Sequence, residues 1–406
     1  VPEQAPCWHT LFEAQAAANP QAMALVNQHG STSYQALNRA ANMLAHQLLA
    51  AGVQAGDKVA VCLPRSGPWA TCLLAVLKAG AVYMPLDPSY PPARLALMLD
   101  DAQAALLLTS RDMEWPGLDA LSKRYCEDWQ GNDTGEGWPD HSALPVSPQQ
   151  GAYCIYTSGS TGVPKGVVNH HLGLSLLAQA QAASFGISRG SCVLQFAALG
   201  FDASISEMAM ALGFGARLIM LEREQLMPGQ PLLAALLAHH VTHITLPASA
   251  LALLPDDANL PPLHLVVAGE ACPPALARRW AQRHRVFNAY GPSEAAVCAT
   301  VHEVDAAGKA VAVVPPSKVS AASSQSSLSQ VTPASKASAI SQISPETKAC
   351  AISPMSTASR ASSSSEASPA FSLPIGVPLP HCRVYVLDAA QRLLTAGMTG
   401  EIHIGG

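Results

Sequence analysis

The sequence contains few charged residues, since only 13% of its 406 residues are Asp, Glu, Lys or Arg, about half the usual share. Lys and Arg number 23 against 28 Asp and Glu, which gives a formal net charge of -5. A chain with this balance lacks the excess of basic residues that binds nucleic acid, so nucleic acid is not expected as a partner. The length predicts roughly two or three domains with a large core.

The sequence also lacks an apolar run of membrane-spanning length. Its longest uncharged stretch lies between Glu224 and Asp256, but prolines interrupt it and histidines lie in its middle. A spanning helix needs about 20 apolar residues in succession. Val1 is not followed by the basic and then apolar segments of a signal peptide. We therefore expect a soluble, cytoplasmic piece of a longer chain, with no membrane partner.

No two of the 10 cysteines form a CxxC pair, and most stand between apolar neighbours, as Cys62 does. This pattern favours reduced, buried thiols in a cytosolic protein, and a zinc site is not expected. His239 and His240 follow a segment rich in Leu and Ala, where they are expected to cap a helix at its C-terminal end rather than bind a metal. His171 is expected to pack a helix rather than act in catalysis.

Aromatic residues are absent between Gly291 and Ala370. Much of this region is rich in serine, with 20 serines in the 56 residues from Ser317 to Ser372. Such a segment cannot bury enough apolar surface to offset the entropy lost when its backbone is ordered. We predict that residues 305–373 form a disordered, Ser/Ala-rich insertion. It is interpreted as a flexible linker, with regulation by phosphorylation as the alternative.

Helical and extended patterns alternate in the residues before this insertion. The segment 34–51 places apolar residues at three- and four-residue spacing and ends at Gly52, as a helix does. The short apolar run 57–63 ends at Pro64, as a buried strand does. Further helices are predicted at 69–79, 92–101, 231–239 and 273–283, and further strands at 81–86, 104–109, 217–221, 243–246 and 264–268. Such alternation predicts an α/β fold with parallel sheets and crossover helices.

The most informative segment for function is 153–166, which reads YCIYTSGSTGVPKG. An apolar strand leads into a loop of glycines and hydroxyl residues that ends at Lys165, so backbone amides and a cation can neutralise phosphate oxygens. Val163 and Pro164 stand where a Walker A loop needs Gly-Lys, so this is a different loop. An ordinary flexible Ser/Gly turn would not require the preceding strand or the following Pro-Lys-Gly.

This loop resembles the signature phosphate loop of adenylate-forming enzymes. Five more segments resemble, in order, the core motifs of amino-acid-activating adenylation domains of nonribosomal peptide synthetases: SYQAL (33–37), LKAGAVYMPLD (77–87), FDAS (201–204), NAYGPSE (288–294) and GEIHIGG (400–406). The resemblance implies two stacked α/β subdomains in 1–304 and the beginning of a small β-rich subdomain in 374–406. It also implies that the chain ends before the family's C-terminal lid and its lysine.

The resemblance further implies a reaction. ATP and an amino acid would give aminoacyl-AMP and pyrophosphate, and the phosphopantetheine thiol of a peptidyl carrier protein would then capture the aminoacyl group. Mg²⁺ is the implied cofactor, and neighbouring synthetase domains of the parent chain are implied partners. Attack of a carboxylate on a phosphate brings two anions together, so positive charge and amide dipoles are needed. Without the lid, turnover is expected to be poor.

The resemblance assigns the nucleotide site residue by residue. Lys165 and Thr157 are the expected catalytic residues, both also contacting ATP, and Glu294 matches the magnesium ligand. Tyr290 is expected to stack on the adenine. The other expected ATP-binding residues are Ser158, Gly159, Ser160, Thr161, Gly162, Gly269, Glu270, Ala271, Asn288, Ala289, Gly291 and Ser293.

Asp202 matches the carboxylate that binds the substrate's α-amino group, an ion pair that is stronger in a dry pocket than at the surface. It could also cap a helix over 203–212. The other positions that match the family's pocket are mostly small or apolar: Ala203, Ser206, Thr245, Val266, Ala268, Ala289, Val297 and Cys298. An uncharged pocket with the hydroxyls of Ser206 and Thr245 predicts a tyrosine-like substrate, with phenylalanine second.

Two alternatives stay open. One is an adenylate-forming ligase for a fatty or aryl acid. Asp202 argues against it, because a substrate without an amine gives that carboxylate no partner. The other is a non-catalytic remnant that serves as a nucleotide-binding or scaffolding module. Failure of the parent protein to exchange pyrophosphate with any amino acid would favour this second alternative.

Overall fold

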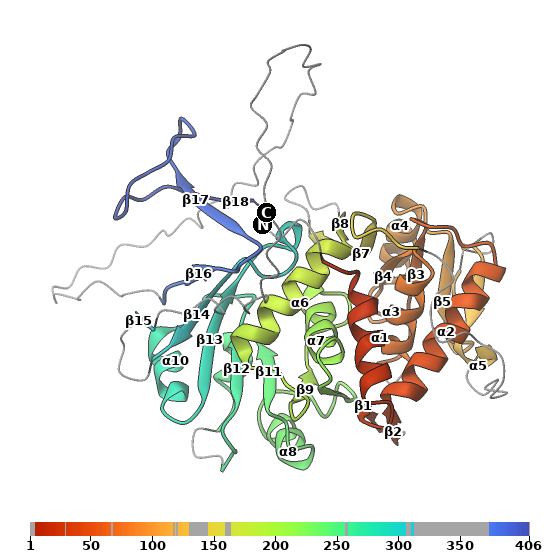
Figure 1. Cartoon of the computed structure of the whole chain (residues 1–406), viewed down its shortest axis with the longest axis horizontal. Coiled ribbons are helices and arrows are strands. Elements are labelled where there is room, and N and C mark those ends of the chain that lie inside the picture. Colours follow the sequence, from red (N-terminus) through yellow and green to blue (C-terminus); the bar gives the residue numbers. More distant parts are fainter. Residues whose placement is uncertain are drawn as a thin grey trace, which may run out of the picture.

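The computed structural model describes residues 5–28, 30–65, 68–116, 118, 121–129, 145–158, 164–255, 259–305, 310–311 and 373–405. Most of the predicted Ser/Ala-rich insertion, 305–373, lies outside these residues, as do Gly159, Ser160, Thr161 and Gly162 of the predicted phosphate loop. Two sheets organise the described residues, the smaller in orange to yellow and the larger mostly in green to cyan (Figure 1).

The smaller sheet has six described strands in the order β6-β5-β3-β4-β7-β8. All neighbours are parallel except β8, which returns antiparallel to β7. These strands are β3 (Lys58–Val61), β4 (Val82–Pro85), β5 (Leu106–Thr109), β6 (Lys123–Tyr125), β7 (Gly151–Ser158) and β8 (Pro164–His170).

The larger sheet has ten described strands in the order β15-β14-β13-β12-β11-β9-β10-β1-β2, with β16 also paired to β14. The run from β13 to β1 is parallel, and antiparallel strands flank it on both sides. The strands are β1 (Met23–Asn27), β2 (Gly30–Ser33), β9 (Cys192–Gln195), β10 (Arg217–Met220), β11 (His243–Leu246), β12 (His264–Val267), β13 (Arg285–Tyr290), β14 (Thr300–Val304), β15 (Ala310–Val311) and β16 (Val377–Pro378).

Helices fill the space between the sheets and cover their outer faces. The largest apolar cluster joins both sheets to α1 (Trp8–Ala18), α2 (Tyr34–Ala50), α3 (Trp69–Lys78), α6 (His171–Phe185) and α7 (Asp202–Leu212). A second cluster packs α8 (Gln230–Ala238), α9 (Ala248–Leu251) and α10 (Pro274–Ala281) on the outer face of the larger sheet. A third packs α4 (Pro92–Asp101) on the smaller sheet, and α5 (Cys126–Trp129) follows β6.

This architecture confirms the predicted two stacked α/β subdomains. Successive strand residues alternate between faces: Val59 and Val61 belong to the cluster between the sheets, whereas Ala60 packs with α4. All nine cysteines in the described part of the chain are free, and eight of them are buried, as predicted. In the same part of the chain, no helix is long and apolar enough to cross a membrane.

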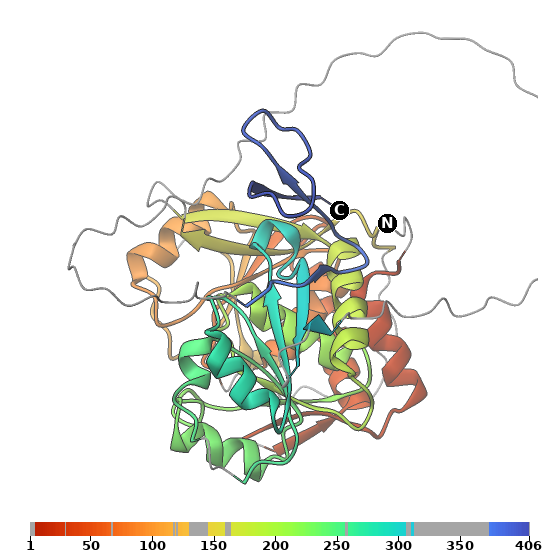
Figure 2. The same ribbon diagram turned by 90° about the vertical axis from the view of Figure 1, so that its left-hand side faces the viewer.

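The residues after 373 were predicted to begin one small β-rich subdomain. In the structure, β16 pairs with the larger sheet, and only β17 and β18 form a sheet of their own. Pro374 accepts a hydrogen bond at its carbonyl oxygen from Asn288 Nδ2 at 2.8 Å, and Leu379 N donates to the carbonyl oxygen of Ala299 at 2.8 Å. Leu379 is buried in the central cluster. Residues 374–379 therefore pack on the larger sheet, to which β16 (Val377–Pro378) adds a short strand. The hairpin of β17 (Arg383–Leu387) and β18 (Glu401–Gly405) forms a separate sheet that projects from the body (Figures 1 and 2).

A buried polar network ties the two subdomains together. Arg65, in the loop after β3, donates to carbonyl oxygens at or beyond the ends of β9 and β10, those of Gln195, Phe196, Ala197 and Leu221. Glu207 of α7 is fully buried and accepts hydrogen bonds from the backbone N–H groups of Phe196 and Ala197. Burial raises the pKa of Glu207 to about 8, while the hydrogen bond from Gln195 and the charge of Arg65 act in the opposite direction.

We expect Arg65→Ala to destabilise the fold by about 3 kcal/mol, because it leaves several carbonyl groups without their donor and removes a positive charge near the buried Glu207. Urea unfolding followed by circular dichroism measures this effect. Arg39→Ala changes an exposed arginine of α2 and is expected to shift stability by less than about 0.5 kcal/mol. Equal midpoints for the two variants would contradict a stabilising role for the Arg65 network.

Candidate functional site

The predicted phosphate loop connects β7 to β8, and the structure places its two ends side by side. Thr157 and Lys165 are paired across the antiparallel hairpin, as are Ser158 and Pro164. Lys165 is exposed, and Thr157 is half-buried. The two predicted catalytic residues thus stand opposite each other at the base of the loop, the glycines of which lie outside the described residues.

Asp202 is the first residue of α7, so it does not precede the helix as a capping residue would. Its carboxylate accepts a hydrogen bond from Ser293 Oγ at 2.5 Å. Ser293 begins the short 3₁₀ helix η1 (Ser293–Ala295), which also carries Glu294. The FDAS and NAYGPSE segments, far apart in the sequence, therefore meet at this hydrogen bond.

Asn169 joins the phosphate-loop hairpin to the same point. This buried residue of β8 donates from Nδ2 to the Ser293 carbonyl oxygen at 3.0 Å. Lys165 lies on the same strand, so β8 connects the base of the phosphate loop to the segment that carries Glu294. Sequence reasoning missed Asn169, because a lone Asn beside His170 matches no motif.

The surroundings of Asp202 make its charged form less favourable than that of a free aspartate. Desolvation raises the pKa of Asp202, the hydrogen bond from Ser293 lowers it, and the nearby charge of Glu294 raises it again. A buried carboxylate with an acidic neighbour gains most from a positively charged partner. A substrate ammonium group would supply that partner.

The predicted pocket residues of the larger sheet share one face. Thr245 and Val266 are direct partners on β11 and β12, and Val266 is in turn paired with Phe287 of β13. Ala268 and Ala289 lie two residues further along β12 and β13, so they point to the same side. Val266, Phe287 and Ala289 belong to the cluster that contains α7, with Ala268 packed against it.

Helix α7 carries three more of the predicted pocket residues. Asp202 and Ser206 are four residues apart and therefore lie on one face of the helix, next to Ala203. Ser206 Oγ donates to Gln181 Oε1 of α6 at 2.7 Å, and both side chains are buried. The predicted pocket hydroxyl is thus held by Gln181, a residue that the sequence did not indicate.

The last two predicted pocket residues lie in the segment after η1. Val297 has a left-handed backbone with φ 70° and packs against the central cluster, and Cys298 is buried in that cluster. Burial raises the pKa of Cys298 to about 12, with Cys382 and Asp202 contributing in the same direction. A Cβ atom on Gly291 would lie 2.6 Å from Ala299 N, so only glycine allows this close approach.

The predicted adenine-binding residues stand at the carboxyl ends of β12 and β13. Strand alternation turns Asn288 and Tyr290 to the face opposite Ala289. Asn288 Nδ2 is bonded to Pro374, as described above. The turn of Gly269, Glu270 and Ala271 is exposed, and the Glu270 carboxylate accepts hydrogen bonds from Ser249 N and Oγ, which lower its pKa.

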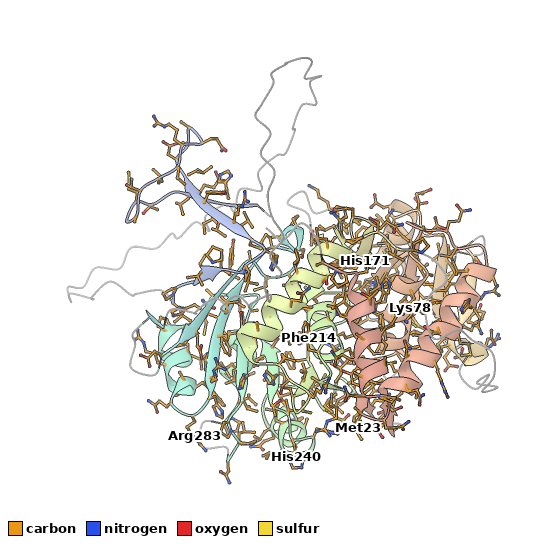
Figure 3. The ribbon with its side chains drawn as sticks, viewed as in Figure 1. Met23, Lys78, His171, Phe214, His240 and Arg283 are labelled. Atoms are coloured by element: carbon orange, nitrogen blue, oxygen red, sulfur yellow. The ribbon has the colours of Figure 1, made fainter. Side chains whose placement is uncertain are left out.

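The site therefore forms where ligands bind in open α/β sheets, outside the carboxyl ends of the strands. An open depression of about 360 Å³ lies at the other end of the strands, lined by Met23, Arg189 and Arg217 among others. Figure 3 places Met23 at the lower edge of the molecule, whereas His171 lies in its upper part. The depression contains none of the predicted site residues.

The family model of the AMP-binding enzymes matches residues 12–325. The probable non-canonical nonribosomal peptide synthetase CymA of Salinispora arenicola is 39% identical over 98% of this chain and 4% of its own length. Chondramide synthase cmdD of Chondromyces crocatus is 35% identical over 98% of this chain and 9% of its own length. The chain thus spans only a small part of these relatives.

Solved structures share the fold. The N-terminal subdomain of Klebsiella oxytoca NpsA, in complex with 3-hydroxybenzoyl-AMSN, has a TM-score of 0.73 and 24% identity, covering 98% of this chain and 85% of its own. The four-domain nonribosomal peptide synthetase AB3403, bound to AMP and glycine, has a TM-score of 0.73 and 22% identity, covering 99% of this chain and 26% of its own. The chain belongs to the AMP-binding enzyme family, with the fold of the N-terminal part of a nonribosomal peptide synthetase adenylation domain.

Proposed function

We propose that this chain binds ATP and an amino acid and activates the amino acid as aminoacyl-AMP, with release of pyrophosphate, for transfer to the phosphopantetheine of a carrier protein. The observation that carries the proposal is the position of Asp202. Its carboxylate stands at the start of α7, hydrogen-bonded to Ser293, on the helix that also carries the predicted pocket residues Ala203 and Ser206. A substrate ammonium group there completes an ion pair that the protein alone leaves unbalanced.

The phosphate groups of ATP belong at the β7–β8 loop in this proposal. Lys165 and Thr157 face each other at its base, and Asn169 connects β8 to η1. Lys165 would neutralise phosphate charge, and the adenine would stack on Tyr290 beyond the carboxyl end of β13. These placements bring the α-phosphate toward Asp202, so that the substrate carboxylate can attack in line.

The Glu294 carboxylate fits a magnesium ion, because it is exposed and lies close enough to Asp202 to raise that residue's pKa. Oxygen ligands of this kind suit Mg²⁺, which usually binds through one or two carboxylates and substrate phosphates. Bound Mg²⁺ would offset phosphate charge. The protein's part is to hold Glu294 on η1, with Ser293 fixed from both sides by Asp202 and Asn169.

The proposed substrate is tyrosine or a close relative, with phenylalanine second. Ser206 is a small residue at a position that matches the family's pocket, and its hydrogen bond to Gln181 would place polar groups near a para hydroxyl. Pyrophosphate exchange by the parent synthetase with a panel of amino acids tests this choice. A preference for a charged or a small aliphatic amino acid would refute the tyrosine proposal while leaving amino acid activation intact.

Ser206→Phe is expected to move the preference from tyrosine to phenylalanine by roughly tenfold or more, because the larger side chain fills the space for a para hydroxyl. Ser206→Ala is the matched control, since it removes the hydroxyl without filling the space. The ratio of kcat/KM for the two amino acids measures the effect. An unchanged ratio in Ser206→Phe would show that this position does not line the end of the pocket.

We also propose that residues 1–406 alone bind the adenylate but turn over slowly, because a lid would supply a lysine to the reacting carboxylate. The Klebsiella oxytoca N-terminal subdomain was solved in complex with 3-hydroxybenzoyl-AMSN. Ligand binding by this chain can therefore be measured apart from turnover. Exchange rates for residues 1–406 that equal those of the parent synthetase would refute the need for a lid.

A further inference from the structure

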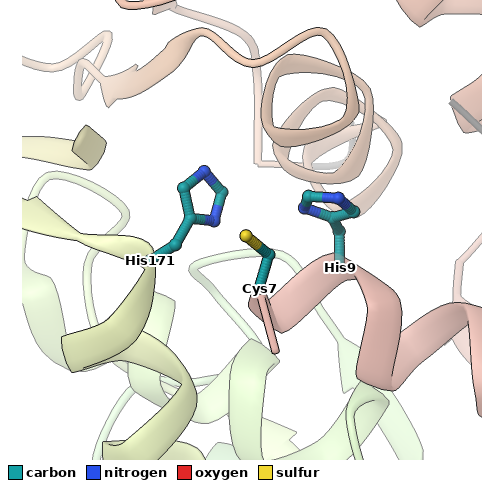
Figure 4. A group of neighbouring side chains, drawn as sticks. All are labelled: Cys7, His9 and His171. Carbon is teal, nitrogen blue, oxygen red and sulfur yellow. The ribbon is translucent and has the colours of Figure 1, made fainter. Parts of the chain in front are cut away.

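A compact group of three buried ligand-type side chains lies outside the proposed adenylation site. Cys7 precedes α1, His9 is in its first turn, and His171 is the first residue of α6. One nitrogen or sulfur atom from each lies within 4.8 Å of the others. Figure 4 shows the Cys7 thiol between the two imidazole rings, which approach from different helices.

The two imidazoles lack the hydrogen bonds that buried polar groups normally make. His9 Nδ1 and both ring nitrogens of His171 have no hydrogen-bond partner within the described part of the chain. Their exposed fractions are 3% for His9 and 0% for His171, and that of Cys7 is 4%. The two rings contact each other edge to face, with centroids 5.4 Å apart. Their unbonded nitrogen atoms are therefore available to a bound ligand.

We propose that Cys7, His9 and His171 bind a zinc ion. Two imidazoles and a thiolate form the nitrogen and sulfur donor set that zinc prefers in tetrahedral sites. Ligand atoms around a bound zinc are about 3.5 Å apart, so the three atoms must close by about 1 Å, which side-chain rotation can provide. Binding replaces the Cys7 S–H bond by a Zn–S bond and releases the proton to solvent.

Burial raises the pKa of the Cys7 thiol, so zinc must displace the thiol proton to gain a thiolate ligand. Burial lowers the pKa of His9 to about 3 and that of His171 to about 4, so the imidazoles are neutral, as metal ligands must be. The nearby Lys78 is buried in an ion pair with Glu13. The Cys7 sulfur donates to the carbonyl oxygen of Val146 at 3.3 Å, which brings a further oxygen donor to the cluster.

Such an ion would fasten α1 to α6. His171 follows β8 directly, and its backbone N–H donates to the carbonyl oxygen of Gln150, just before β7. The zinc ion would therefore hold the first helix against the end of the β7–β8 hairpin that lies away from the phosphate loop. Spacing rules cannot find such a site in the sequence, because its ligands come from segments far apart in the chain.

Cobalt titration of the reduced, EDTA-treated protein tests the proposal, with Co²⁺ as a spectroscopic substitute for zinc. We expect one Co²⁺ ion per chain to bind with a thiolate-to-cobalt charge-transfer band, which equimolar Zn²⁺ then removes. Cys7→Ser is expected to abolish the band. Cys62→Ser, which removes a buried thiol on the smaller sheet, is the matched control and should keep it.

His9→Gln keeps the thiol and removes one ligand, so it should retain a charge-transfer band but weaken Co²⁺ binding by more than about 100-fold. This variant decides the question if Cys7→Ser fails to fold. The proposal is overturned if folded, reduced wild-type protein shows no charge-transfer band at saturating Co²⁺. It is also overturned if His9→Gln binds as tightly as wild type, which would assign the cluster to ordinary core packing or a buried water.

Discussion

Replacing Asp202 by Asn is expected to weaken binding of a tyrosyl-sulfamoyl adenosine analogue by about 3 kcal/mol, or roughly 100-fold. The substitution keeps the shape of the side chain and removes its charge, so the substrate ammonium group loses its partner in a half-buried site. ATP affinity should change little, because the proposed nucleotide contacts are on the β7–β8 loop and beyond β13 rather than at Asp202. Isothermal titration calorimetry measures both affinities.

Asp112→Asn serves as the control, since it neutralises an exposed aspartate away from the site. Acidification provides a second check. Because burial raises the pKa of Asp202, the carboxylate is neutralised as the pH falls through that raised pKa, and analogue binding to the wild type should weaken. Asp202→Asn should show no such weakening. Parallel pH profiles for the two proteins would contradict the assigned role.

Lys165→Ala is expected to weaken ATP binding by about 2 kcal/mol, or roughly 30-fold, because it removes the cation at the base of the phosphate loop. Binding of a tyrosyl adenylate analogue without β- and γ-phosphates should change far less. The contrast between the two ligands separates a phosphate contact from general damage to the site. Fluorescence titration with a labelled ATP measures the first affinity.

Lys165→Arg keeps the charge and should retain most of the ATP affinity. Lys58→Ala, at the start of β3, is a control for the loss of one positive charge elsewhere in the same sheet. If Lys165→Ala bound ATP as tightly as Lys58→Ala, the β7–β8 loop would not be the phosphate site.

The elements predicted from local patterns were found with small errors at their ends, whereas α1, α6, β9 and β13 were not predicted. The helix predicted at 34–51 is Tyr34–Ala50, and the strand predicted at 243–246 is His243–Leu246. Both depend on residues close in sequence: the spacing of apolar side chains and nearby stop signals. His239 ends α8, as predicted for the C-terminal end of that helix.

Long-range pairing could not be predicted in the same way. The position of β1 beside β10 and the return of residues 374–379 to the larger sheet depend on packing across the whole core. The same holds for Asn169 and Gln181, which acquire their roles only when β8 meets η1 and α6 meets α7. A motif identifies residues that match a pattern, but not the neighbours that hold them.

The central claim is that Asp202 recognises an α-amino group, which makes the protein an amino-acid-activating enzyme. The most direct measurement compares two ligands of the wild-type chain by calorimetry: tyrosyl-sulfamoyl adenosine and the same molecule without its α-amino group. The proposal predicts that the amino compound binds at least about 100-fold more tightly. Equal affinities would contradict it and favour activation of a carboxylic acid that has no amine.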